Sequence, residues 1–179
     1  MSPKILVGYI TRAGYTRTVA EAIARRLHEH DLETDVVDLE LSLRQPRKYH
    51  AVILGSAVRF GHHPTAMHEF ITMNRAALMD RPTAFFSVER KPATDEAMQA
   101  LFRQTEWQPL RTLAVLGVQG ALLRRTVAWV QDRLDATSVT HVAAPTEWAR
   151  IDAFADEVAE LVRARTERQR PLDRAMQSP

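Results

Sequence analysis

Short apolar runs alternate with amphipathic segments along most of this chain. Five of these runs have the length of a buried strand: residues 4–10, 33–40, 49–58, 82–88 and 111–118. Between the first two, Val19, Ile23 and Leu27 recur at helical spacing and predict a helix over residues 16–30. Strands that alternate with helices usually pair in parallel and are covered on both faces. The pattern therefore predicts a doubly wound α/β fold.

Three more amphipathic segments predict helices, at residues 64–78, 93–107 and 147–168. Pro64 suits a first helical turn, and Thr94 is a candidate N-cap. The connection at residues 41–48 is too short for a crossover helix and contains Pro46, so the second helix is expected to be short or absent.

The region after the fifth predicted strand departs from this regular alternation. Residues 119–145 form an excursion much longer than the usual α/β connection of about 2–6 residues. The chain ends in a polar, proline-bearing stretch. We therefore expect a single domain over residues 1–168 and a disordered tail over residues 169–179.

Composition narrows the function classes. The chain has 179 residues and a formal net charge of +2. It contains no cysteine, so disulfides and thiolate chemistry are excluded and any redox chemistry needs a cofactor. The mild basic excess favours anionic small molecules without requiring nucleic acid. The first residues lack the pattern of a signal peptide, and no apolar run reaches the roughly 20 residues of a membrane span. We expect a cytoplasmic protein.

The first candidate site follows the first predicted strand, where doubly wound sheets bind ligands. The hexad at residues 11–16 combines hydroxyls with Gly14 at the start of a helix, and such a turn can cradle a phosphate monoester. The alternative is structural, with Thr16 as a simple N-cap and Gly14 as a simple turn residue. P-loop and dinucleotide-binding glycine patterns are absent from this hexad.

The second candidate site follows the third predicted strand, in the segment "GSAVRFGHHPTAMHEF". Gly55 and Gly61 permit close backbone approach, and Phe60 with His62 offers flat surfaces beside the cation Arg59, which suits a planar heteroaromatic ring. The alternative places Phe60 in the core and the histidines in a solvated turn. The three histidines at 62, 63 and 68 lack a metal-binding spacing, so no metal site is expected.

Four stretches together carry a family resemblance: "TRAGYTRTVAEAIARRL", "VILGSAVRFGHHPTAMHEFI", "AFFSVERKP" and the late "EW…FADEVAEL". They resemble the flavodoxin-like, menaquinone-dependent protoporphyrinogen IX dehydrogenases of bacterial haem synthesis over about residues 4–162. The resemblance implies a flavodoxin-like fold of strand order 2-1-3-4-5 that binds FMN. It also implies oxidation of a porphyrinogen with a quinone as the electron acceptor.

The resemblance further implies where each part of the cofactor and substrate lies. The FMN phosphate would lie on Thr11, Arg12, Ala13, Gly14, Tyr15 and Thr16. One side of the isoalloxazine would be flanked by Ser56, Ala57, Val58, Arg59, Phe60 and Gly61, and the other by Ser87, Val88, Glu89 and Lys91. The substrate would contact Arg59, His62, Lys91, Arg124 and Arg125, whose cations suit porphyrinogen propionates.

The chain also departs from the family. Ala13 stands where typical flavodoxins carry a hydroxyl or acidic residue, which removes one phosphate contact but leaves the backbone cradle. The excursion at 119–145 corresponds in place to the family's long insertion but is shorter and richer in arginine. It is interpreted as a substrate or quinone recognition element or, alternatively, as an extra amphipathic helix packed on the domain.

Two other functions stay open. Electron-carrier flavodoxins are strongly acidic because they dock on basic partners, and the net charge of +2 argues against that class. An NAD(P)H-dependent quinone reductase is not excluded by the sequence. No loop residue is an obvious catalytic acid or base, although Arg59 is a candidate beside the ring. Peripheral contact with the inner membrane and oligomer formation also stay open.

Overall fold

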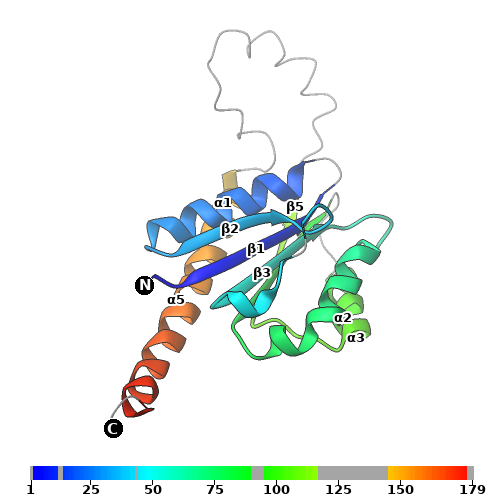
Figure 1. Ribbon diagram of the computed structural model, residues 1–179. Helices are drawn as coiled ribbons and strands as arrows, with labels where there is room; N and C mark the ends of the chain where they lie inside the picture. The colour runs from blue at the N-terminus through cyan, green and yellow to red at the C-terminus, as the bar shows by residue number, and fades with distance from the viewer. Residues whose placement is uncertain (1, 12–13, 43, 90–94, 117–144, 177–179) are drawn as a thin grey trace.

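A parallel sheet forms the centre of the protein. The structure, a computed structural model, describes residues 2–11, 14–42, 44–89, 95–116 and 145–176 (Figure 1). The strands are β1 (Lys4–Ile10), β2 (Glu33–Asp38), β3 (Ala51–Ala57), β4 (Thr83–Glu89) and β5 (Arg111–Leu116). All neighbours pair in parallel in the order β2-β1-β3-β4-β5. The predicted doubly wound sheet and its strand order are confirmed.

Helices cover both faces of this sheet. Helices α1 (Tyr15–Glu29) and α5 (Pro145–Met176) lie on one face, and α2 (Thr65–Met79) and α3 (Glu96–Thr105) lie on the other (Figure 1). Between β2 and β3 the described residues form only a short 3-10 turn, η1 (Pro46–Lys48). The prediction of a short or absent second helix is therefore confirmed.

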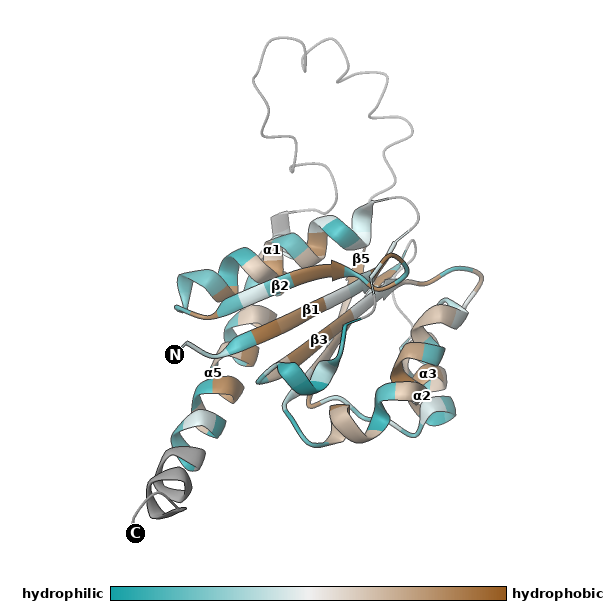
Figure 2. Cartoon of the chain, in the orientation of Figure 1, coloured by the Kyte–Doolittle hydropathy of each residue, from teal (hydrophilic) through white to brown (hydrophobic). Residues whose placement is uncertain are grey.

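Alternation of side chains along β1 explains how one strand serves two cores. Ile5 and Val7 pack with α1 and α5, whereas Leu6 and Ile10 point to the other face and pack with α2 and α3. All four side chains are buried. The central strands are accordingly apolar along most of their length (Figure 2), as a sheet covered on both faces requires.

Two predicted boundaries differ from the structure. The N-cap position of α3 is occupied by Asp95, without a side-chain capping bond, so the assignment of that cap to Thr94 is wrong. Helix α5 continues to Met176, past Arg168, where the sequence predicts a disordered tail. Extending an existing helix adds one hydrogen bond for almost every residue ordered, with Pro171 as the exception because it has no backbone N–H. We propose that the domain itself ends near residue 168.

Gly55 has a role in the core that its sequence context did not predict. Gly55 lies opposite Phe86 of β4, and a Cβ atom on Gly55 would lie 2.0 Å from Cζ of the Phe86 ring. The Phe86 side chain is fully buried, so the space above Gly55 is already filled. The interpretation that Gly55 gives close approach to a ligand ring is therefore wrong, and the glycine instead admits an aromatic side chain of the protein.

We expect Gly55→Ala to destabilise the fold by about 1–3 kcal/mol, because the added methyl group displaces Phe86 in a filled core. Chemical denaturation followed by circular dichroism measures this change. Adding Phe86→Leu should recover part of the loss, since the double variant makes room for the methyl group. Strictly additive effects of the two substitutions would contradict the proposed clash.

Candidate functional site

The carboxyl ends of three strands bring the predicted site segments together. Ile10 pairs with Ser56, and Ser56 pairs with Ser87, so the loops after β1, β3 and β4 begin side by side. The backbone N–H of Val58 also donates to the carbonyl of Val88 at 2.9 Å, which fixes the second loop against the third. The candidate site is this edge of the sheet.

The first loop enters α1 through a glycine in the left-handed region. Gly14 occupies the N-cap position with a φ of 85°, and its N–H donates to the hydroxyl of Thr11 at 3.0 Å. The reading of Thr16 as the N-cap is therefore wrong, because Thr16 lies inside the first turn. The earliest N–H groups of a helix have no intrahelical acceptor, and here they open toward the site edge.

Thr16 has a buried hydroxyl that the oxygen of a ligand could satisfy. Its side chain is fully buried, yet its hydroxyl has no hydrogen-bond partner among the described residues. Gly14, two residues before it, has open space where a Cβ atom would stand. An unpaired buried hydroxyl, a helix N-terminus and an open glycine face together fit a phosphate-sized oxyanion.

The second loop is a tight hairpin that presents an aromatic ring to solvent. Arg59 and His62 exchange backbone hydrogen bonds of 2.9 and 3.0 Å, and both residues between them have positive φ, 51° at Phe60 and 80° at Gly61. Positive φ at both central residues is the requirement of a type I′ turn. Phe60 is 98% exposed, so its alternative assignment to the core is wrong. A bulky residue held this way is strained, which is common at ligand-binding turns.

A buried pair anchors the base of this hairpin. The Ser56 hydroxyl and Nδ1 of His63 lie 2.8 Å apart, and both side chains are buried. The His63 ring packs edge-on against Phe85, and burial lowers its pKa to about 4, with a smaller contribution from His68. His63 is therefore neutral near pH 7. The reading of the histidines as solvated turn residues holds for exposed His62 but is wrong for His63.

The third loop begins with a buried carboxyl. Ser87 is fully buried at the end of β4 and donates a 3.1 Å hydrogen bond to Glu89, which is also buried. Burial raises the pKa of Glu89, and the hydrogen bond from Ser87 opposes part of that shift. The protein thus holds a weakly acidic carboxyl group at the site edge. In the sequence, only the position of Glu89 at the end of a predicted strand indicated that it belongs to the site.

The remaining predicted residues divide into two groups. Tyr15 starts α1 half-buried, while Ala57, Val58 and Val88 lie at the adjoining strand ends. The other predicted contacts lie outside the described residues: Arg12, Ala13, Lys91, Arg124, Arg125 and, apart from Pro145, the excursion at 119–145.

Comparisons with known proteins agree with this fold. The sequence profile of a family described as the flavodoxin domain matches residues 6–144. The chain is 28% identical to protoporphyrinogen IX dehydrogenase [quinone] of Escherichia coli strain K12, covering 88% of this chain and 96% of that protein. It is 29% identical to the protein of the same name from Leishmania major, covering 89% and 76%.

A solved structure shares the fold. Oxidised flavodoxin 1 from Bacillus cereus aligns with a TM-score of 0.59 at 15% identity, covering 88% of this chain and 97% of that chain. At this identity the likeness speaks for the fold alone. It agrees with the strand order and the helix layers described above.

We expect His63 to make the fold less stable as the pH falls from 6.5 to about 4. Its folded-state pKa is lowered from 6.5 to about 4, so over this range the unfolded chain binds a proton that the folded chain does not. The free energy of unfolding should therefore fall by up to ~1.4 kcal/mol for each pH unit in this range. Urea unfolding of wild type and His63→Gln across this range measures the difference between their slopes. The control is His62→Gln, at an exposed histidine. Equal slopes in wild type and His63→Gln would show that His63 is not held neutral.

Proposed function

This chain belongs to the flavodoxin domain family, and on that premise we propose that it is an FMN-dependent oxidoreductase that oxidises protoporphyrinogen IX and passes the electrons to a quinone. The fold supports FMN as the cofactor, because sheets of this strand order bind it at the β1/β3 switch point. When bound, FMN supplies hydride acceptance and stepwise electron release. The relatives named for this reaction support the choice of substrate and acceptor.

The buried hydroxyl of Thr16, which has no hydrogen-bond partner among the residues that the structure describes, is the observation that carries the cofactor assignment. In the proposed complex this hydroxyl and the first backbone N–H groups of α1 would donate hydrogen bonds to the 5′-phosphate. The bond from the Gly14 N–H to Thr11 holds the loop in the open shape that the phosphate needs. The N-terminal end of the helix dipole adds a favourable field for the dianion. Arg12 and Ala13, which lie outside the described residues, belong to the same proposed cradle.

The hairpin after β3 is the proposed support for one side of the flavin ring. Its backbone hydrogen bonds fix the turn, and its strained tip holds Phe60 clear of the core, where an aromatic face is available for stacking. The buried bond between Ser56 and His63 ties both ends of the hairpin to β3. Ser87 and Glu89 would border the other side of the ring, together with Val88 and Lys91.

The substrate side of the proposal rests on cations near the same edge. Arg59 is exposed next to Phe60, and a guanidinium can bind a porphyrinogen propionate through two parallel hydrogen bonds. His62, exposed on the same hairpin, is a second proposed contact. Lys91, Arg124 and Arg125 complete the proposed set. A substrate with an apolar body and two carboxylates fits this mixture of an exposed aromatic ring and cations.

Charge favours this function over that of an electron carrier. With a net charge of +2, the chain lacks the strong net acidity of carriers, which dock on basic partners. An NAD(P)H-quinone reductase stays as the second candidate, since it would use the same cofactor site. In the described part of the chain, no helix is both long and apolar enough to cross a bilayer. A cytoplasmic location with peripheral contact to the inner membrane, where quinones dissolve, is part of the proposal.

We expect Thr16→Val to weaken FMN binding about tenfold to a hundredfold, the equivalent of one lost hydrogen bond to a charged group. The same substitution should leave the FMN-free protein equally or more stable, because it removes an unpaired buried hydroxyl. Fluorescence titration and thermal unfolding measure the two effects. Thr18→Val is the matched control, since the Thr18 hydroxyl already bonds the Gly14 carbonyl. Unchanged FMN affinity in Thr16→Val would place the phosphate elsewhere.

We expect the flavin absorbance of the purified protein to bleach under anaerobic conditions on addition of protoporphyrinogen, and to return on addition of a soluble quinone. Arg59→Gln should raise the KM for porphyrinogen about tenfold by removing a charge-assisted contact, whereas Arg103→Gln, at an exposed site on α3, should not. Bleaching by NADPH alone would favour the quinone reductase. Bleaching by neither donor would favour an electron carrier.

A further inference from the structure

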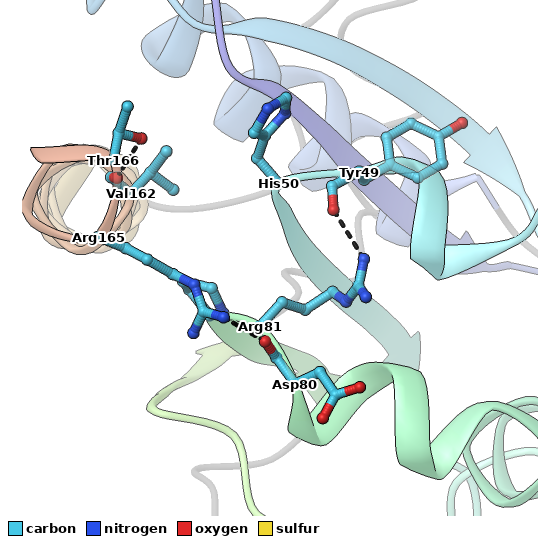
Figure 3. A pocket seen from close by; sticks show the side chains of 8 residues that line it. Tyr49, His50, Asp80, Arg81, Val162, Arg165 and Thr166 are labelled. Atoms are coloured by element: carbon cyan, nitrogen blue, oxygen red, sulfur yellow. Dashed lines mark hydrogen bonds between the residues drawn. The ribbon is translucent and has the colours of Figure 1, made fainter. Parts of the chain in front are cut away.

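A cavity of about 180 Å³ opens at the opposite edge of the sheet from the proposed flavin site. It lies where β3 and β4 begin, between the end of α2 and the face of α5 that carries Val162, Arg165 and Thr166 (Figure 3). Residues 162, 165 and 166 share one helix face because they are three and four positions apart. Water takes about 30 Å³ per molecule, so the cavity has room for a phosphate-sized ligand.

Arg81 forms one wall of this cavity and is held rigidly. Its Nε donates to the carbonyl of Ala77, and its Nη1 donates to the carbonyls of Pro46 and Tyr49 at 2.7 and 2.8 Å. These bonds use three of the five guanidinium N–H groups and leave Nη2 without a partner among the described residues. The side chain is half-buried, and burial lowers its pKa, with Arg165 and Arg47 adding to the effect and Asp80 opposing it.

The other polar groups of the cavity are also mainly donors. Arg165 reaches across from α5 and donates to the backbone carbonyl of Asp80 (Figure 3). His50 accepts the Lys4 N–H at Nδ1, so its neutral ring carries the proton on Nε2. Within the described part of the chain, neither Arg81 nor Arg165 forms an ion pair, although Asp80 lies at the cavity wall.

Two arginines line this cavity without an ion pair among the described residues, so they leave a net positive charge that the nearby Asp80 offsets only in part. We propose that this cavity is a second anion site that binds a phosphate-type oxyanion between Arg81, Arg165 and His50. The rigid backbone clamp on Arg81 preorganises one donor group, which lowers the entropic cost of binding. Arg165 is free at Nε and Nη1 among the described residues, so it can close on the ligand from α5.

The position of the cavity favours a free anion over a phospholipid headgroup. It lies about 20 Å from the flavin edge, since β3 spans seven residues between the two edges at about 3.3 Å each. A bilayer bound at this cavity would hold the flavin edge away from the membrane, where a lipid-soluble quinone must be reached. This choice of source, unlike the site itself, rests on the proposed quinone acceptor.

The test uses the FMN-saturated protein, so that the phosphate cradle at Thr16 is filled. Inorganic phosphate is titrated at constant ionic strength while backbone amide NMR shifts are followed. We expect saturable shifts at residues 49–50, 80–82 and 165–166. Arg165→Gln should weaken this binding about tenfold, whereas Arg103→Gln, with the same charge change at an exposed site, should leave it unchanged. Arg165 is the better target because Arg81 also holds three carbonyls of the fold.

Three outcomes would overturn the proposal. The absence of saturable shifts at these residues would remove the site. Equally weakened phosphate binding in Arg165→Gln and Arg103→Gln would show that the binding is only a general attraction to positive charge. In a second experiment the same variants are sedimented with phosphatidylglycerol or phosphatidylcholine vesicles. Loss of phosphatidylglycerol binding in Arg165→Gln alone, without binding of free phosphate, would make the ligand a lipid headgroup and overturn the assignment to a free anion. Neither experiment measures turnover, so failure here would leave the proposed redox function untouched.

Discussion

The parallel pairing of β1 with both β2 and β3 is the constraint on which the rest of this protein depends. The chain leaves β1 toward β2 and then crosses back over β1 to β3, so the connections that follow β1 and β3 run in opposite directions along the sheet. The register places Ile10 beside Ser56 and Ser56 beside Ser87. The loops that meet at the site are therefore adjacent through backbone pairing alone, before any side chain contributes.

Much of the fold could be predicted because its determinants are local. Buried parallel strands are short and apolar, and helices such as α1 repeat their apolar residues at helical spacing, so both appear within a window of a few residues. The loop at residues 11–16 could be singled out as a candidate phosphate site for the same reason. Its details could not, because Gly14 rather than Thr16 occupies the cap position, and the sequence does not tell which hydroxyl ends up buried.

The features that the sequence failed to predict depend on neighbours that are distant along the chain. The space above Gly55 is filled by Phe86 only because β3 and β4 pair in this register. His62 and His63 are adjacent and identical in type, yet one is exposed and the other buried. The type I′ turn decides between them, since it turns the chain back so that His63 meets Ser56. Excluded volume and turn geometry, rather than residue type, thus determine what fills the space above Gly55 and which histidine is buried.

The two edges of the sheet differ in the charge of their side chains, and this difference matters for a redox cofactor. At the carboxyl edge the buried polar groups tend toward their neutral forms: burial lowers the pKa of His63 to about 4 and raises the pKa of Glu89. Among the described residues, the N-terminus of α1 and exposed Arg59 add positive potential there, and both favour anions. A reduced flavin carries negative charge, so this edge suits a cofactor that is reduced by a substrate. The arginines at the amino edge lie about 20 Å away along β3, too far to act strongly on the flavin through screened water.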